Sequence, residues 1–160
     1  MKKQLKTYNL VKNKHVPNEY LINSKDTRLK VLAGMIDTDG TVSREGTRVN
    51  ISQGPLHENL LKQIMLLSKS LGFMATTTKK KVTWTHKGIK KEGYAFGLNI
   101  SGNGIEEIPT LLNRKKCHNP KKRETTSIGT LTIEQYEDGD YVTIEVDGSG
   151  RFVNENFIVM

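Results

Sequence analysis

Residues 32–40 read LAGMIDTDG, a largely apolar run that ends in two aspartates and a glycine. Carboxylates are ligands for hard divalent cations such as Mg²⁺ and Ca²⁺. Asp37 and Asp39 lie two residues apart, so on a helix they cannot share a face, and only one can point into a given site. The pattern Asp-x-Asp-Gly also begins calcium-binding loops, but no glutamate follows at the twelfth position. The stretch is therefore expected to offer one carboxylate to a site.

A helix over about residues 27–39 is expected to position these aspartates. Ser24 or Asp26 can cap its start, residues 28–36 are mostly good helix formers, and Gly40 is a plausible stop. An ordinary amphipathic helix that ends in an acidic turn is one interpretation. The other is a helix interface, because small side chains one turn apart let two helices approach closely. The interface candidates are Ala33, Gly34 and Asp37, with Thr38 beside them.

Apolar periodicity predicts the other elements. One strand is expected to bury a single face, because four apolar residues alternate strictly in it: Tyr94, Phe96, Leu98 and Ile100. In chain order, the expected elements are a helix at 27–39, strands at 41–43 and 48–53 around a turn at 44–47, a helix at 56–71, strands at 73–86 and 94–100, and a helix at 105–112.

Seven of the nine residues at 32–40 are identical to the LAGLIDADG signature of homing endonucleases, and Met35 and Thr38 differ. With the order of elements, they make residues 14–125 resemble one LAGLIDADG module. The resemblance implies an α+β fold, helix-strand-strand-helix-strand-strand-helix, whose curved antiparallel sheet lies on DNA. It also implies a site-specific endonuclease that hydrolyses phosphodiester bonds in both DNA strands with a divalent metal, Mg²⁺ or Mn²⁺.

The resemblance also assigns roles to single residues. The second aspartate of the signature is the family's metal ligand, which points to Asp39 and the adjacent Gly40. The family places a lysine near the metal-bound water; Lys116 is the favoured match and Lys115 the alternate, unless this basic run only binds phosphates. Gln53 is expected to orient that water. Two-metal catalysis needs a second carboxylate, so a second LAGLIDADG half is expected, from a missing N-terminal region or from another copy of the chain.

Charge is distributed unevenly along the chain, whose net charge is +8. Residues 1–131 contain 24 Lys and Arg against 10 Asp and Glu, whereas residues 132–160 contain one Arg and 7 Asp and Glu. A basic body of this kind is typical of a polyanion-binding protein, although a solubilising lysine surface has a similar composition. Double-stranded DNA is therefore the expected partner. No membrane partner is expected, because no apolar run approaches the length of a membrane span.

Polar and basic side chains on the expected strands are the candidate DNA contacts, because they can donate to base edges and phosphates. The alternating sets that begin at Arg48 and at Lys81 are expected to lie together on one face of the sheet, although a solvated strand face would look the same. Trp84, of opposite parity to Lys81, is expected in the core. The candidates are Arg44, Arg48, Asn50, Ser52, Lys79, Lys80, Lys81, Thr83, Thr85, Lys87, Lys90, Lys91 and Asn99.

The acidic C-terminal segment resembles the last block of inteins. Alternation predicts a strand at 141–146, a tight turn at 147–150 and a second strand-like run at 152–160. In that family the run continues into His-Asn, but this chain stops at Met160, so it is not expected to splice as given. The segment before the signature adds to a similarity with the C-terminal part of inteins of the yeast vacuolar-ATPase type.

Three regions are therefore expected. They are a linker or peripheral segment at 1–25, the endonuclease module at 26–125 and incomplete splicing-domain strands at 131–160. The single Cys117 and the absence of a signal peptide favour an intracellular site, the cytoplasm or nucleus. Two alternatives stay open. One is a free-standing single-motif enzyme that acts as a homodimer, and the other is a catalytically decayed DNA-binding or maturase-like element.

Overall fold

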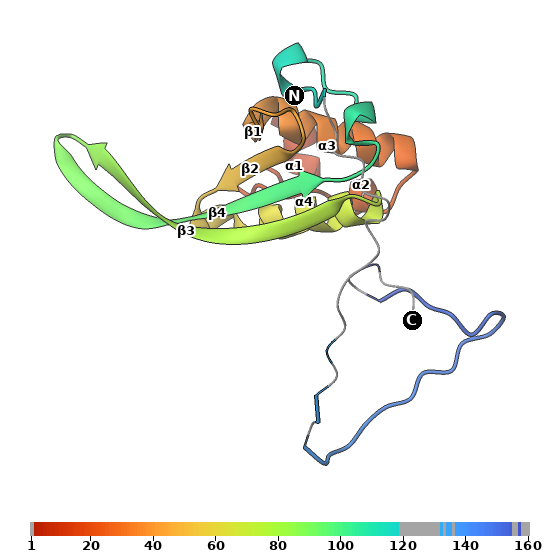
Figure 1. The fold of residues 1–160 in the computed structure, drawn as a ribbon. Coiled ribbons are helices and arrows are strands. Elements are labelled where there is room, and N and C mark those ends of the chain that lie inside the picture. Colours follow the sequence, from red (N-terminus) through yellow and green to blue (C-terminus); the bar gives the residue numbers. More distant parts are fainter. Residues whose placement is uncertain (1, 119–131, 133, 136, 155–156, 158–160) are drawn as a thin grey trace. The chain divides into compact units, whose positions relative to one another are not determined.

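The structure is a computed structural model that describes residues 2–118, 132, 134–135, 137–154 and 157. Contacts divide the chain into two compact units, residues 1–126 and residues 127–160. All helices and strands assigned in the described residues belong to the first unit, in which helices pack on one antiparallel sheet (Figure 1).

The sheet of the first unit has four antiparallel strands in the order β1-β2-β4-β3. The strands are β1 (Gly40–Val42), β2 (Val49–Gln53), β3 (Met74–His86) and β4 (Ile89–Ser101). The helices are α1 (Lys2–Thr7), α2 (Asn18–Leu21), α3 (Lys25–Asp39) and α4 (Glu58–Ser70), and three 3₁₀ turns are η1 (Pro55–His57), η2 (Ile105–Glu107) and η3 (Asn113–Lys115). The predicted order of helix, two strands, helix and two strands is confirmed, and the fold is α+β.

Helix α3 begins and ends for different physical reasons. Ser24 caps its start, since the Ser24 Oγ accepts a hydrogen bond from the Thr27 backbone N–H at 3.2 Å. At its end, the helix stops before Gly40 as predicted, and Gly40 has an extended backbone with φ of −80°. A Cβ on Gly40 would lie 2.8 Å from the Cα and the carbonyl oxygen of Ile36. Glycine is therefore required here by close backbone packing, where the chain passes directly from α3 into β1.

The core lies between the sheet and helices α3 and α4. α4 packs on β2, β3 and β4, while α3 packs on β1 and β2. Burial of such aliphatic side chains contributes about 1.5–3 kcal/mol each to folding. The most deeply buried are Leu32 and Ile36 of α3, Leu61, Ile64 and Leu67 of α4, and Val49, Ile51, Leu98 and Ile100 of the sheet.

Strands β3 and β4 form a long hairpin that continues past the end of β2. Gln53, the last residue of β2, pairs with Phe96, so residues 80–95 pair only within this hairpin. We call residues 80–95 the arm, and Figure 1 shows it curving away from the helices. Its tip is a two-residue turn in which Lys87 and Gly88 both have positive φ, 51° and 78°. The arm thus carries strand residues beyond the part of the sheet that the helices cover.

The predicted helix at 105–112 is wrong. The structure has only the short 3₁₀ turns η2 and η3 in and after this region, joined by extended backbone. Ile108 has φ of −61° and ψ of 121° because it precedes Pro109, and a residue before proline is disfavoured in the helical conformation. Pro109 also lacks the N–H that a continuing helix needs.

The interpretation of residues 1–25 as a linker or peripheral segment is wrong at Val16. The Val16 side chain is 1% exposed and belongs to the core. Its backbone N–H donates to Gln63 Oε1 at 2.9 Å, and Gln63 Nε2 donates back to the Val16 carbonyl at 3.3 Å. This reciprocal pair holds the chain on α4, so part of the N-terminal segment belongs to the module.

The described residues of the second unit do not form the predicted strand at 141–146. Tyr141 and Val142 are 87% and 90% exposed, and a strand forms only when its backbone pairs with a neighbour. The predicted turn is present, with positive φ at Gly148 and Gly150. Most of the run at 152–160, including Met160, lies outside the described residues. No helix in the described part of the chain is long and apolar enough to cross a membrane.

Candidate active site and nucleic-acid interface

The end of α3 brings Asp39 to the end of β2. Gln53 Nε2 donates a hydrogen bond to Asp39 Oδ2 at 2.7 Å, and Gln53 is only 8% exposed. A buried amide of this kind fixes the orientation of the carboxylate. The other oxygen, Oδ1, has no hydrogen-bond partner among the described residues, and Asp39 is exposed. This arrangement presents one oriented carboxylate oxygen to a ligand from outside.

Asp37 faces a different part of the chain, as the spacing of the two aspartates predicted. Its Oδ2 accepts the Leu111 backbone N–H at 2.8 Å, and its Oδ1 accepts the Leu112 backbone N–H at 3.1 Å. We call residues 111–118 the strap, since they pack back onto the start of the sheet. Asp37 therefore anchors the strap, while Asp39 is left for a site.

The strap has two further attachments. Lys115 Nζ donates a hydrogen bond to the carbonyl of Gly40. The His118 backbone N–H donates to the Gly46 carbonyl at 3.2 Å, and the His118 ring fills the space where a Cβ on Gly46 would lie. The strap thereby holds a buried lysine, 5% exposed, against the residue that follows Asp39.

The structure brings Lys115, the alternate candidate, to this site and leaves Lys116, the favoured one, exposed. Lys116 has an extended backbone, so side chains alternate along this part of the strap. Cys117 is buried beside it, and burial raises the pKa of its thiol to about 11. Because Cys117 points toward the core, Lys115, two residues earlier, points toward the core as well. This two-residue spacing is the feature of the sequence that could have distinguished Lys115 from Lys116.

The residues present give a divalent cation only part of a coordination sphere. No group of three or more His, Cys, Asp and Glu that could hold a metal occurs in the described residues. The Gly40 carbonyl, predicted as a ligand with Asp39, is already hydrogen bonded to Lys115. Mg²⁺ is nevertheless often held by one or two carboxylates together with substrate phosphates. One exposed carboxylate fits such a site, provided that further oxygen ligands come from elsewhere.

The three helix-interface candidates do not lie on one exposed ridge. Ala33 is 3% exposed and packs in the module's own core, and Asp37 is engaged with the strap. Gly34 and Thr38 are exposed on α3, and a Cβ on Gly34 would meet nothing within 4 Å. Of the residues considered for a helix interface, only Gly34 and Thr38 are therefore exposed.

The strand register divides the candidate DNA contacts between the two faces of the sheet. We call the face opposite the buried residues the outer face. Asn50 pairs with Asn99, and Asn99 pairs with Thr76, so these side chains share the outer face. By the same register Ser52, Lys80 and Lys91 lie there, and Arg48 precedes β2 with the same parity. The residues on the opposite face are Lys79, Lys81, Thr83, Thr85 and Lys90, and Arg44 and Lys87 lie in turns.

The expectation that the sets beginning at Arg48 and Lys81 share one face is therefore wrong. The lysines of the two faces also differ in their contacts. Lys81 Nζ lies 2.6 Å from Glu92 Oε2, and Lys79 Nζ lies 4.6 Å from the centroid of the Tyr94 ring. Lys80 and Lys91 of the outer face make no ion pair with any described residue. The outer face thus carries cations that are available to a polyanion, and Lys90 of the opposite face also makes no ion pair with a described residue.

Residues 15–128 match the model of the family described as "Homing endonuclease". The chain belongs to the homing endonuclease family. Membership implies a nuclease that binds DNA, in agreement with the exposed carboxylate and the basic outer face. The match includes α2, α3, the whole sheet and the strap.

Two curated proteins are similar to this homing endonuclease chain. The replicative DNA helicase DnaB of Mycobacterium intracellulare is 30% identical over 153 residues, which cover 92% of this chain and 25% of the helicase. The ATP-dependent DNA helicase Hel308 of Thermococcus kodakarensis is 29% identical over 165 residues, which cover 92% of this chain and 14% of the helicase. The chain therefore spans a quarter or less of the length of these relatives.

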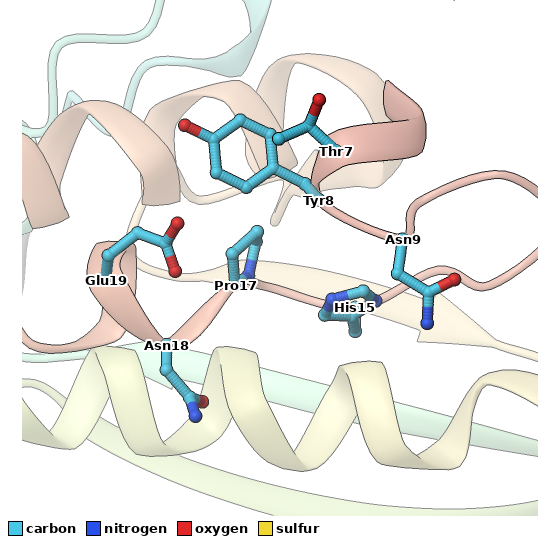
Figure 2. Close-up of a pocket in the computed structure, with 7 residues that line it drawn as sticks. All are labelled: Thr7, Tyr8, Asn9, His15, Pro17, Asn18 and Glu19. Carbon is cyan, nitrogen blue, oxygen red and sulfur yellow. The ribbon is translucent and has the colours of Figure 1, made fainter. Parts of the chain in front are cut away.

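A hollow of about 310 Å³ lies near the N-terminus of the homing endonuclease module (Figure 2). It contains none of the predicted site residues. Tyr8 lines this hollow, and the pKa of Tyr8 is raised, mainly by a hydrogen bond with Tyr20. The lining comes from α1, α2 and the loop between them: Thr7, Tyr8, Asn9, His15, Pro17, Asn18 and Glu19.

Proposed function

We propose that this chain is the second-motif half of an intein-encoded LAGLIDADG homing endonuclease, joined to a C-terminal protein-splicing segment. It would hydrolyse phosphodiester bonds of both DNA strands at a specific site, with Mg²⁺ or Mn²⁺. The observation that carries the proposal is the exposed Asp39 carboxylate at the end of α3, oriented by Gln53 at 2.7 Å. The nuclease family matched by residues 15–128 supports it.

Three residues of this chain have defined parts in the proposed reaction. Asp39 would ligate the divalent cation, and that cation, when bound, would neutralise phosphate charge and lower the pKa of an attacking water. Gln53 holds the carboxylate in one orientation. The Lys115 ammonium, fixed by the Gly40 carbonyl, would stabilise the negative charge that develops on the phosphate oxygens. Lys116, exposed on the strap, would contact DNA phosphates instead.

A second LAGLIDADG half would complete the site. One exposed carboxylate supplies too few oxygen ligands for two metals, and the described residues offer no further cluster of ligands. Gly34 and Thr38 are exposed on α3, and small residues allow a second helix to approach closely. The second half is expected from an N-terminal region of a longer protein. A homodimer of the free-standing chain is the alternative.

The alignments with the two helicases support an intein origin. Each covers 92% of this chain, so each extends beyond residues 15–128 into the acidic C-terminal segment. The matched region is a quarter or less of each helicase, and the family of the matched region is an endonuclease. An element inserted into unrelated host proteins explains this combination. Such an element would act in the compartment that holds the DNA, the cytoplasm or the nucleus.

A cleavage and binding assay of Asp39→Asn tests the proposal. With the full precursor and Mg²⁺, cutting of the DNA that spans the uninterrupted insertion site should be lost, while the affinity for that DNA stays within about twofold. Retained cutting would contradict the role of Asp39, and loss of binding would contradict its assignment to a metal. Wild-type chain that binds DNA without any cutting, with a partner half present, would favour the decayed or maturase-like alternative.

A further inference from the structure

Trp84 is the chain's one tryptophan, and it lies on the outer face of the arm. It is 48% exposed, so the expectation that it lies in the core is wrong. Its ring lies across the neighbouring strand over Gly93. A Cβ on Gly93 would be 3.0 Å from both Cη2 and Cζ3 of Trp84. The missing side chain of Gly93 lets the ring lie close to β4.

Tryptophan is enriched at interfaces, so an exposed ring of this size is a candidate for a binding surface. The helices do not reach it, because the arm continues beyond the end of β2 (Figure 1). Val82 lies on the same face, directly opposite Gly93. On the outer face of the arm, the apolar surface is formed by Trp84, Val82 and Ile89, and the described residues leave it uncovered.

The charges around Trp84 indicate what covers it. Lys91 is its direct partner on β4, and Lys80 lies on the same face of β3. Neither lysine is paired with a described carboxylate. If a second copy of the chain covered this surface with its own outer face, lysines would lie against lysines and repel one another. The complementary partner is a polyanion that also presents apolar groups, and duplex DNA is such a partner.

In the major groove the apolar group on the base edges is the 5-methyl group of thymine. A two-stranded ribbon such as the arm fits this groove. We propose that Trp84 is a sequence-reading residue whose ring contacts the 5-methyl group of a thymine, with Gly93 as the residue that positions the ring. This inference rests on the proposed DNA-binding function and extends it to one base pair.

Selection from a random duplex library tests the proposal. The chain, Trp84→Ala and Tyr94→Ala would each be used to enrich bound sequences. Tyr94 is the matched control, since it is 52% exposed on the same arm but lies on the opposite face. Thymine preference at one position should be present for the chain and for Tyr94→Ala, and absent for Trp84→Ala.

Replacing that thymine with deoxyuridine then removes the methyl group alone. The affinity of the chain should fall about fourfold, the value expected for burial of one methyl-sized group. The affinity of Trp84→Ala should not change. Gly93→Ala, which pushes the ring away from β4, should weaken the thymine preference without altering the lysines.

Three outcomes would overturn this inference alone. Equal sensitivity to deoxyuridine in the chain and in Trp84→Ala would exclude the methyl contact while leaving DNA binding intact. Equal loss in Tyr94→Ala would exclude the outer face as the reading surface. If self-association without DNA protects the fluorescence of the single tryptophan from quenching by acrylamide, a second copy of the chain covers the ring. A chain that binds no DNA would overturn the proposed function together with this inference.

Discussion

Asp37 Oδ2 accepts the backbone N–H of Leu111 at 2.8 Å, across 74 residues of sequence. Both oxygens of Asp37 are therefore occupied by backbone N–H groups, whereas Asp39 Oδ1 has no partner among the described residues. It holds the strap, and the strap holds Lys115 against Gly40. Two carboxylates that are two residues apart thus have different partners at the same end of one helix, the strap for Asp37 and Gln53 for Asp39.

Asp37→Ala is expected to release the strap. Two hydrogen bonds to a charged acceptor are lost, which should lower the free energy of unfolding by about 1–2 kcal/mol. Hydrogen exchange of the Leu111 and Leu112 amides should accelerate, and cleavage should fall because Lys115 is no longer fixed. Asp37→Asn keeps one acceptor and should show a smaller change. Unaltered exchange of both amides would show that Asp37 does not anchor the strap.

Lys80→Ala and Lys81→Ala are a matched pair of adjacent residues on opposite faces of β3. DNA affinity should decrease steeply with salt for the chain, because binding releases counterions. Lys80→Ala should reduce the slope of log affinity against log salt by about one, and Lys81→Ala should leave it unchanged, since Glu92 already neutralises Lys81. Equal effects of the two substitutions would contradict the assignment of the outer face to DNA. A flat salt response of the unsubstituted chain would contradict DNA binding itself.

The variants Gly34→Ala and Gly40→Ala distinguish a glycine needed for contact with a partner from a glycine needed for packing inside the chain. A Cβ on Gly34 meets nothing within 4 Å, so alanine there should stabilise the isolated chain by about 0.5–1 kcal/mol. The same change should weaken pairing with a second half, measured by sedimentation. Gly40→Ala places a Cβ 2.8 Å from the backbone of Ile36 and should destabilise the chain by about 1–3 kcal/mol. Unchanged pairing in Gly34→Ala would place the partner elsewhere.

Gly46→Ala should destabilise the chain more than Gly88→Ala. Both glycines have positive φ, +68° and +78°, so the backbone strain of an alanine is similar, about 1–2 kcal/mol. Only at Gly46 would the new Cβ also lie 2.4 Å from the His118 ring. The double variant with Gly46→Ala and His118→Ala should lose this additional destabilisation, measured as the free energy of unfolding in urea. No recovery would mean that the ring does not pack on this turn.

Cys117 should make the stability of the chain fall at alkaline pH. Burial raises the pKa of its thiol from 9.0 to about 11, so the folded chain holds a proton that the unfolded chain releases. The stabilisation is complete below pH 9 and is lost as the pH rises toward 11. Cys117→Ala should lack this component when unfolding is measured from pH 7 to 11. Parallel pH profiles for the two proteins would contradict burial of the thiol.

The sequence by itself determined the elements that local periodicity encodes. Helical spacing of the leucines placed α4, strict alternation from Tyr94 to Ile100 placed part of β4, and Ser24 was one of two caps expected for α3. The separation of Asp37 and Asp39 was also predictable, because two residues on a helix are about 200° apart. These properties depend on near neighbours in the chain, so they can be read without knowledge of the fold.

Only the tertiary structure decided which distant residues meet. Alternation says which residues of one strand share a face, but strand register decides how that face relates to the next strand. For this reason Lys81 and Arg48 were wrongly placed together, and Trp84 was wrongly assigned to the core. Likewise, Lys115 is buried against Gly40 and Lys116 is exposed because the strap is attached to Asp37 and Gly46, by contacts across more than 70 residues.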